Sequence, residues 1–297
     1  MRKGDQILCI GSVLWDVIGR SSSHMRAGSD VPGRITRLPG GVAMNIAMTL
    51  RRFGMSPILL TAIGIDAEGR ELLRQCQHMG MITDFVYLSE DLPTDRYMAV
   101  EGANGLIAAI ADAHSLEAAG DKILRPLADG RLGQQDAPYG GLIALDGNLT
   151  VSLLTEIADS PLFAAADLRV APASPGKAER LLPLLHHPKA TFYVNREEAG
   201  LICHKRFDNS ADAAIGLMEK GAHRALVTDG GAPAAMADAG RIITGSPREV
   251  MVTRVTGAGD TFMAAHIAAE VAGAGAEAAL NDALQAAADY VSGDTQL

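Results

Sequence analysis

The chain has 297 residues, a formal net charge of −9 and an isoelectric point near 5.3. This length can bury a substantial core and is sufficient for one large domain or for two. A protein that binds the nucleic-acid backbone needs a basic face, so the acidic balance argues against a nucleic-acid partner.

Other sequence features bear on the compartment in which the protein works. No run of about 18 apolar residues is present, so we expect no transmembrane helix and no membrane partner. Residues 1–5 lead directly into a short strand, without the long apolar stretch of a signal peptide. Cys9, Cys76 and Cys203 are far apart and odd in number, which argues against a disulfide framework. We therefore expect a cytoplasmic protein.

Short apolar runs alternate with segments of helical spacing along most of the chain. The predicted strands are Ile7–Ile10, Ile58–Ala62, Leu142–Leu145, Leu168–Val170, Thr191–Val194 and Ala225–Thr228. The predicted helices are Met44–Phe53, Glu68–Met79, Lys177–Leu185, Ala211–Lys220, Phe262–Ala272 and Ala276–Val291. Buried parallel strands separated by helices indicate an α/β fold, with helices on both faces of the sheet.

Two stretches interrupt this alternation. Val17–Leu38 is rich in Ser, Gly and Arg. Thr94–Asp112 is typical of a hairpin, with strands Tyr97–Val100 and Leu106–Ile110 on either side of a four-residue turn, Gly102–Gly105. From these residues alone, the hairpin is either an ordinary surface feature or part of a sheet that covers a ligand.

The most informative segment is Arg254–Phe262, which contains Gly257-Ala258-Gly259-Asp260 directly before an alanine-rich apolar helix. Glycines let backbone N–H groups converge on an anion, and a helix N-terminus adds free donors and a positive dipole end. An acid at this place is explained if Asp260 removes a proton from a hydroxyl that attacks a phosphoryl group. The four residues alone fit a glycine-rich turn capped by Asp equally well.

Three other segments have both a functional and a purely structural interpretation. Gly40-Gly41 precedes a helix whose first turn carries Asn45, which either offers polar contacts to hydroxyls or marks a buried helix start. Asn195–Glu198 has the spacing of a capping box, and it also suits a ligand site. Thr228–Gly231 follows a buried strand, as a plain turn or as a place where the chain approaches a ligand closely.

Taken together, GGxAxN near the front and TGAGDTF near the back resemble the two signatures of the ribokinase (PfkB) family of carbohydrate kinases. Gly64–Asp66, Asn195–Glu198 and Thr228–Gly231 resemble further motifs of that family, in the same order along the chain. The resemblance implies a ribokinase-like three-layer sandwich, with a mostly parallel central sheet covered by helices. It also implies one domain over residues 1–297, with a small β-sheet lid from segments at about 17–38 and 94–112.

The resemblance further implies a kinase that uses ATP and Mg²⁺. Asp260 corresponds to the catalytic base, and the N–H groups of Gly257, Ala258 and Gly259 correspond to the anion hole. The other implied contacts are Asp16, Gly40, Gly41 and Asn45 for the acceptor, Asn195, Thr228, Gly230 and Gly231 for the nucleotide, and Glu198 for Mg²⁺ through water.

Two positions depart from the family pattern. Many members have Asn two residues before the acceptor-binding Asp, where this chain has Leu14. Members activated by a monovalent cation usually have Asp six residues before the base, where this chain has Arg254. A guanidinium there would repel a cation and could replace its charge, so a dependence on potassium is doubtful.

A narrower resemblance bears on the acceptor. The segment Ala171–Ala178 is similar to a Pro-Val-Ser-x-x-Lys-Ala segment of the pseudouridine kinase branch, as are Ala108–Asp112, Leu145–Leu149 and Val255-Thr256 to other parts of that branch. Lys177 would donate to a pyrimidine carbonyl or hold a phosphate of the substrate; alternatively it is a solvated lysine at a helix start.

The expected reaction is therefore phosphorylation of the 5′-hydroxyl of pseudouridine. Ribose, another sugar or another nucleoside is the alternative acceptor. A non-catalytic sugar-binding sensor on the same fold is a third hypothesis, but such a protein should lack the base or the anion hole. A homodimer through the lid and a monomer are both compatible with these motifs.

Overall fold

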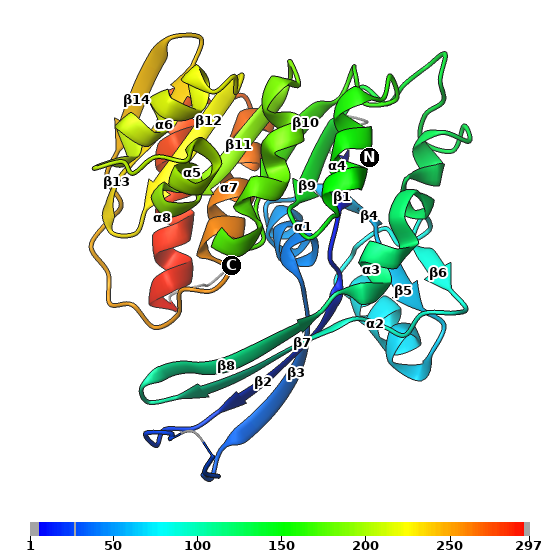
Figure 1. Ribbon diagram of the computed structural model, residues 1–297, viewed down its shortest axis with the longest axis vertical. Coiled ribbons are helices and arrows are strands. Elements are labelled where there is room, and N and C mark those ends of the chain that lie inside the picture. Colours follow the sequence, from blue (N-terminus) through cyan, green and yellow to red (C-terminus); the bar gives the residue numbers. More distant parts are fainter. Residues whose placement is uncertain (1–5, 27, 294–297) are drawn as a thin grey trace.

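The computed structural model describes residues 6–26 and 28–293, and it contains an eight-stranded central sheet (Figure 1). The order of its strands is β14-β13-β12-β11-β10-β9-β1-β4. The bounds are β1 Gln6–Ile10, β4 Ser56–Leu60, β9 Leu142–Asp146, β10 Asp167–Ala171, β11 Ala190–Asn195, β12 Arg224–Asp229, β13 Ala232–Asp238 and β14 Arg241–Gly245. The six strands β4, β1, β9, β10, β11 and β12, which are neighbours in that order, are all parallel. The six predicted strands are thereby confirmed.

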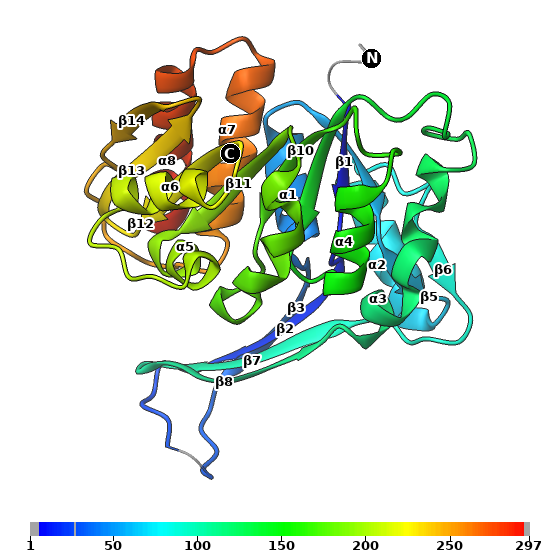
Figure 2. The same ribbon diagram turned by 45° about the horizontal axis from the view of Figure 1, so that its top comes forward.

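Helices cover both faces of this sheet (Figure 2). One face packs against α1 (Val42–Arg52), α2 (Ala67–His78), α7 (Ala258–Val271) and α8 (Ala276–Ser292). The other face packs against α3 (His114–Ala119), η2 (Gly120–Leu127), α4 (Val151–Asp159), η3 (Pro175–His186), α5 (Arg196–Cys203) and α6 (Ser210–Glu219). Alternate side chains of β1 point to opposite faces of the sheet. Leu8 and Ile10 therefore lie in one core cluster, and Ile7 and Cys9 lie in the other. The α/β sandwich with a mostly parallel sheet is confirmed.

Several elements differ from the expectation, and helices α3, η2 and α4 were not predicted. The helix expected at Lys177–Leu185 is the 3₁₀ helix η3, and Pro183 inside it has no N–H to donate to a helical ladder. The antiparallel edge strands β13 and β14 were not predicted. Their two-residue turn, Ala239-Gly240, has positive φ at both positions, and alanine there gives little sequence signal of a hairpin.

A second sheet of four strands extends away from the central one (Figure 1). Its order is β3 (Arg34–Gly40), β2 (Leu14–Arg20), β7 (Arg96–Gly102) and β8 (Gly105–Asp112). The predicted hairpin is present, but its turn is tighter than expected. Gly102 pairs with Gly105, which leaves a loop of only Ala103-Asn104, and a bulge between Val100 and Glu101 accommodates the shift in register.

Two further observations complete the fold. Strands β5 (Ala62–Gly64) and β6 (Tyr87–Ser89) form a short parallel pair beside the central sheet. Within residues 6–26 and 28–293, no helix is long and apolar enough to cross a membrane.

Candidate active site

The two signature segments meet at the carboxyl-terminal edge of the central sheet. Asn45 Nδ2, in the first turns of α1, donates a hydrogen bond to Asp260 Oδ2 of α7 over 3.0 Å, although the residues are 215 positions apart. Ligands of open α/β sheets bind at this edge, beyond the ends of the strands. The fold therefore brings the predicted base and a predicted acceptor contact together.

Asp260 lies in the first turn of α7, whose N-cap is Gly257 in a left-handed conformation with φ of 89°. Burial raises the pKa of Asp260 to about 7; the charges of Asp146, Glu198 and Asp16 act in the same direction, and the Asn45 hydrogen bond acts against them. A carboxylate whose pKa lies near the working pH is suited to general-base catalysis.

The predicted anion hole is only partly open. The N–H of Ala258 donates to the Val255 carbonyl over 3.1 Å. The N–H groups of Gly257 and Gly259 make no hydrogen bond with the residues that the structure describes. A β-carbon at Gly259 would meet no atom within 4 Å, so an incoming group can approach there. Free donors at a helix N-terminus bind anions, and phosphate oxygens are the expected ligands.

The Asp146 carboxylate joins the chain segments that form the base, or floor, of the candidate site. This residue was not predicted from the sequence to belong to the site. This side chain is fully buried at the end of β9. Its Oδ2 accepts from Ser12 N at 2.7 Å, from Ser12 Oγ at 2.9 Å and from Ala43 N at 3.0 Å, and its Oδ1 accepts from Asn148 N at 2.7 Å. The ends of β1 and β9 are thereby joined to the start of α1. An Asp that ends a buried strand and precedes Gly-Asn was the available sequence signal.

The predicted acceptor residues gather beside this carboxylate. Gly40 lies against Asp16, since a β-carbon on it would fall 2.0 Å from Asp16 Oδ2, and Gly41 has φ of 95° beside the Ser12 carbonyl. Burial raises the pKa of Asp16 to about 6. Leu14, the departure from the family pattern, is 5% exposed and packs in the core, so it offers no polar contact.

Lys177 lies at the same edge of the sheet. Its Nζ donates to Asn148 Oδ1 over 2.5 Å, and Asn148 Nδ2 donates to Ser12 Oγ over 2.9 Å. Burial, together with the nearby charge of Arg180, lowers the pKa of Lys177. Lys177 is therefore connected through Asn148 and Ser12 to the floor of the acceptor side and is not a freely solvated lysine.

The predicted nucleotide and metal residues occupy the neighbouring strand ends. Asn195 and Glu198 form a capping box, with both hydrogen bonds 2.8 Å long, so the structural interpretation of this motif is confirmed. Asn195 pairs with Thr228 across β11 and β12. Burial raises the pKa of Glu198 to about 7. Gly230, which has φ of 57°, and Gly231 would each leave a β-carbon in open space.

Glu198 is compatible with a magnesium ion held mainly by phosphates and water. Mg²⁺ usually keeps several waters and takes one or two carboxylates of a protein together with substrate phosphates. Among the residues described, no group of three or more His, Cys, Asp or Glu side chains forms a metal cage. A single carboxyl beside the predicted nucleotide residues agrees with that chemistry, since a nucleotide would supply the other ligands.

Arg254 lies against the carboxyl-terminal end of α8. Its guanidinium stacks over the Tyr290 ring at 3.8 Å from the centroid, and its Nε donates to the Tyr290 carbonyl over 2.7 Å. Tyr290 Oη donates to the Thr256 carbonyl over 2.9 Å, directly before Gly257. Arg254 and Tyr290 therefore join the loop before the anion hole to the end of α8.

Comparisons with known proteins agree with this arrangement. The family model "pfkB family carbohydrate kinase" matches residues 5–293. A pseudouridine kinase of Escherichia coli is 30% identical over 270 residues, which is 89% of this chain and 83% of the relative. A guanosine-inosine kinase of Exiguobacterium acetylicum is 28% identical, over 97% of this chain and 95% of the relative. An Arabidopsis thaliana ribokinase solved with ribose and ATP superposes with a TM-score of 0.76 at 20% identity, covering 96% of this chain and 92% of that structure.

The fold and the family match define a sugar or nucleoside kinase of the ribokinase-like class. The chain belongs to the pfkB family of carbohydrate kinases.

The position of the Asp146 carboxylate predicts that residue 11 must be glycine. This glycine has φ of 147°, and a β-carbon on it would lie 2.4 Å from the carboxyl group of Asp146. We expect Gly11→Ala to lower the free energy of unfolding by about 1–3 kcal/mol through backbone strain alone, and the steric overlap adds to this loss. The measurement is the urea midpoint. The matched control is Gly176→Ala, where a β-carbon meets nothing within 4 Å; equal stability of the two variants would contradict the assignment.

Proposed function

We propose that the protein is an ATP- and Mg²⁺-dependent kinase that phosphorylates the 5′-hydroxyl of pseudouridine. The observation that carries the kinase chemistry is the Asp260 carboxylate, held by Asn45 beside the free N–H groups of Gly257 and Gly259. The acceptor is supported by the position of Lys177 and by the similarity to a pseudouridine kinase over 89% of the chain.

In this mechanism Asp260 accepts the proton of the acceptor hydroxyl as that oxygen attacks the γ-phosphorus of ATP; the bond from that phosphorus to the bridging oxygen breaks, and ADP leaves. Asp16, Gly41 and Asn45 hold the ribose, so the hydroxyl is oriented before it reacts. The N–H donors at the start of α7 stabilise the charge on the transferring phosphoryl group. Mg²⁺ would neutralise charge on the nucleotide phosphates when bound, with Glu198 acting on it through water.

A sugar-binding sensor without catalysis is a weaker proposal. Such a protein has no need of a base at the end of an anion-binding turn, yet Asp260 is present and has its pKa raised to about 7. Ribose remains the second candidate acceptor, because Asp16, Gly41 and Asn45 would hold a ribosyl group with or without an attached base.

The role of Asp260 is tested with Asp260→Asn, which keeps the shape of the side chain but cannot accept the proton. We expect kcat to fall by at least about 10²-fold, while an ATP analogue and the acceptor still bind in calorimetry. In the unchanged protein the base works in its ionised form, so kcat/KM should fall as the pH decreases through about 7.

The control for this variant is Asp282→Asn, the same substitution at an exposed position on α8. Near-normal turnover by Asp260→Asn would show that another group is the base.

Potassium dependence is tested through Arg254. Because its guanidinium already bonds the carbonyl at the end of α8, we expect activity to be nearly the same in potassium and in a large organic cation at constant ionic strength. A strong stimulation by potassium would contradict the replacement of a cation by Arg254.

Acceptor choice is tested by competition between pseudouridine and ribose. Lys177 Nζ bonds Asn148 and has two further N–H donors. A free ribose leaves those donors without the partner that a pyrimidine carbonyl would provide, and an unsatisfied half-buried donor costs about 1–3 kcal/mol, or roughly 5- to 150-fold. We expect pseudouridine to exceed ribose in kcat/KM by at least about tenfold, and Lys177→Ala to reduce that preference.

The control for Lys177→Ala is Lys220→Ala, at an exposed helix end. A preference for ribose, fructose or adenosine that Lys177→Ala leaves unchanged would refute the pseudouridine assignment and leave the kinase assignment intact.

A further inference from the structure

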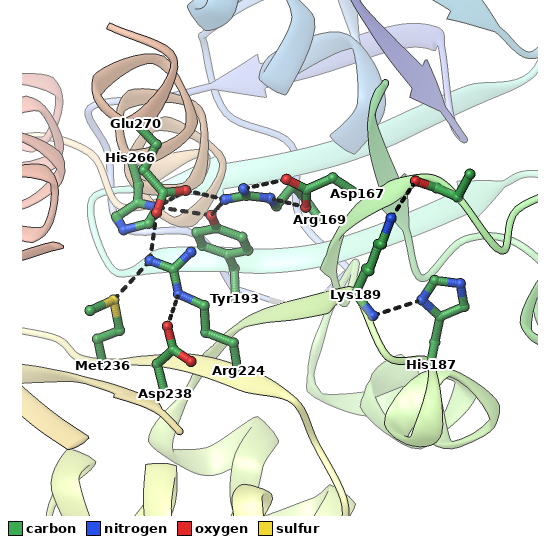
Figure 3. A network of polar contacts seen from close by, with 11 residues as sticks. Asp167, Arg169, His187, Lys189, Tyr193, Arg224, Met236, Asp238, His266 and Glu270 are labelled. Carbon is green, nitrogen blue, oxygen red and sulfur yellow. Dashed lines mark hydrogen bonds and ion pairs between the residues drawn. The ribbon is translucent and has the colours of Figure 1, made fainter. Parts of the chain in front are cut away.

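A second buried polar cluster lies at the opposite end of α7 from Asp260 (Figure 3). Glu270, near the end of this helix, accepts hydrogen bonds from two arginines of the central sheet. Arg169 Nη1 of β10 donates to Glu270 Oε2, and Arg224 Nη2 of β12 donates to Glu270 Oε1 over 2.6 Å. The sheet therefore holds one helical side chain from two strands at once.

Arg169 is itself fixed by hydrogen bonds to groups of the sheet, and Arg224 has a longer ion pair there. Arg169 makes a bidentate pair with Asp167, with both hydrogen bonds 2.7 Å long, and donates to Tyr193 Oη over 3.1 Å. Arg224 lies 3.7 Å from the Asp238 carboxylate. The side chains of Arg169 and Arg224 are 8% and 12% exposed, so water competes little for them. A guanidinium has a rigid planar fork, and fixing it on one side fixes where it can bond on the other.

A neutral histidine extends the cluster one turn towards the site. His266 is fully buried on α7, and its Nδ1 forms a hydrogen bond of 2.9 Å with Tyr193 Oη of β11. Burial lowers the pKa of His266 to about 4, so it stays uncharged at neutral pH. Burial alone would raise the pKa of Glu270, but Arg224 and Arg169 outweigh it and lower that pKa to about 2. The ion pairs therefore persist across the range in which a kinase works.

The rest of the buried face of α7 is mostly apolar. Its apolar side chains lie in the same core cluster as residues of α1 and α8, and they include Phe262, Met263, Ala264, Ala265 and Ile267. The packing of these side chains holds the helix against its neighbours, but hydrophobic attraction itself is non-directional. The hydrogen bonds from two strands to Glu270 add directional contacts that fix the end of the helix relative to the sheet.

We propose that Glu270, held by Arg169 and Arg224, is a positioning residue that sets where Asp260 and the anion-binding turn lie. This inference rests on the proposed kinase function. Glu270 follows Asp260 by ten positions, which is about 15 Å of continuous helix, so an axial shift at one end is transmitted to the other. A misplacement of about 1 Å at a reacting group can cost about 10²-fold in rate. A shift of α7 would also stretch the Asn45–Asp260 hydrogen bond, because Asn45 belongs to α1.

The test compares two carboxylates that share Arg169. Glu270→Gln removes the charge on α7, whereas Asp167→Asn removes a charge that bonds the same guanidinium from within β10. We expect Glu270→Gln to lower kcat by about tenfold or more with a much smaller change in the acceptor KM. The acid limb of kcat/KM should move to higher pH, since the Asn45 hydrogen bond that lowers the pKa of Asp260 is weakened. Asp167→Asn should have a clearly smaller effect on both, because the amide oxygen still accepts a hydrogen bond from Arg169, and the bonds of Arg169 to its other partners remain.

A second variant separates positioning from stability. Replacing a buried ionic group by apolar side chains is often neutral or stabilising, so Arg169→Met/Arg224→Met/Glu270→Met should remain folded. We expect it to show the same loss of kcat, together with faster amide hydrogen exchange at residues 261–263. The exchange measurement needs no turnover, so it tests the inference even if the wild-type protein phosphorylates none of the acceptors. Wild-type kcat and exchange in the triple variant, or an equal loss of kcat in Asp167→Asn, would overturn the proposal.

Discussion

The buried carboxylate of Asp146 is the interaction on which the candidate site depends. A carboxylate without solvent is tolerated only when its lone pairs are satisfied, and four donors from three chain segments do this. Three of those donors are backbone N–H groups, of Ser12, Ala43 and Asn148, so the end of β1 and the start of α1 are placed mainly by main-chain contacts. Asn45 lies only two residues beyond Ala43, so the same contacts also fix the position from which Asn45 bonds Asp260.

The site concentrates acidic groups where a polyanion is expected to bind. The charges of Asp146, Glu198 and Asp16 all raise the pKa of Asp260, although less than burial does. This repulsion is useful to a base, because it makes the carboxylate hold a proton more readily than a solvated aspartate would. The negative charge of these carboxyl groups must be balanced by positive groups when phosphates bind. The N–H donors at the start of α7 and a metal ion near Glu198 are the positive groups that this architecture offers for that purpose.

The sheet and the turn that we propose to be catalytic could both be recognised in the sequence because each is a local pattern. The run Ile7–Ile10 reads as a buried strand without knowledge of its neighbours, and Gly257–Asp260 carries its chemistry within four residues. The role of Asp146 and the Glu270 cluster were not predictable in this way, since their partners lie 134 and 101 residues away in the chain. At Asn195–Glu198 the pattern is local but has two meanings, because a capping box and a ligand site use the same residues. The hydrogen bonds confirm the capping box and do not test the ligand site. Strand β13 was not predicted because its side chains are mostly alanine and give no alternating pattern, and β14 was not predicted because it is only five residues long and largely exposed.

The charges at the two ends of α7 also differ in their relation to the helix dipole. Asp260 lies at the positive end, where the dipole favours its ionised form, yet burial prevails and raises its pKa to about 7. Glu270 lies at the negative end, which disfavours a carboxylate, yet its pKa falls to about 2 because Arg169 and Arg224 supply positive charge there. In each case the tertiary surroundings outweigh the helix itself. The same helix thus carries a carboxylate that can exchange a proton near neutral pH at one end, and a permanently ionised carboxylate that ties it to the sheet at the other.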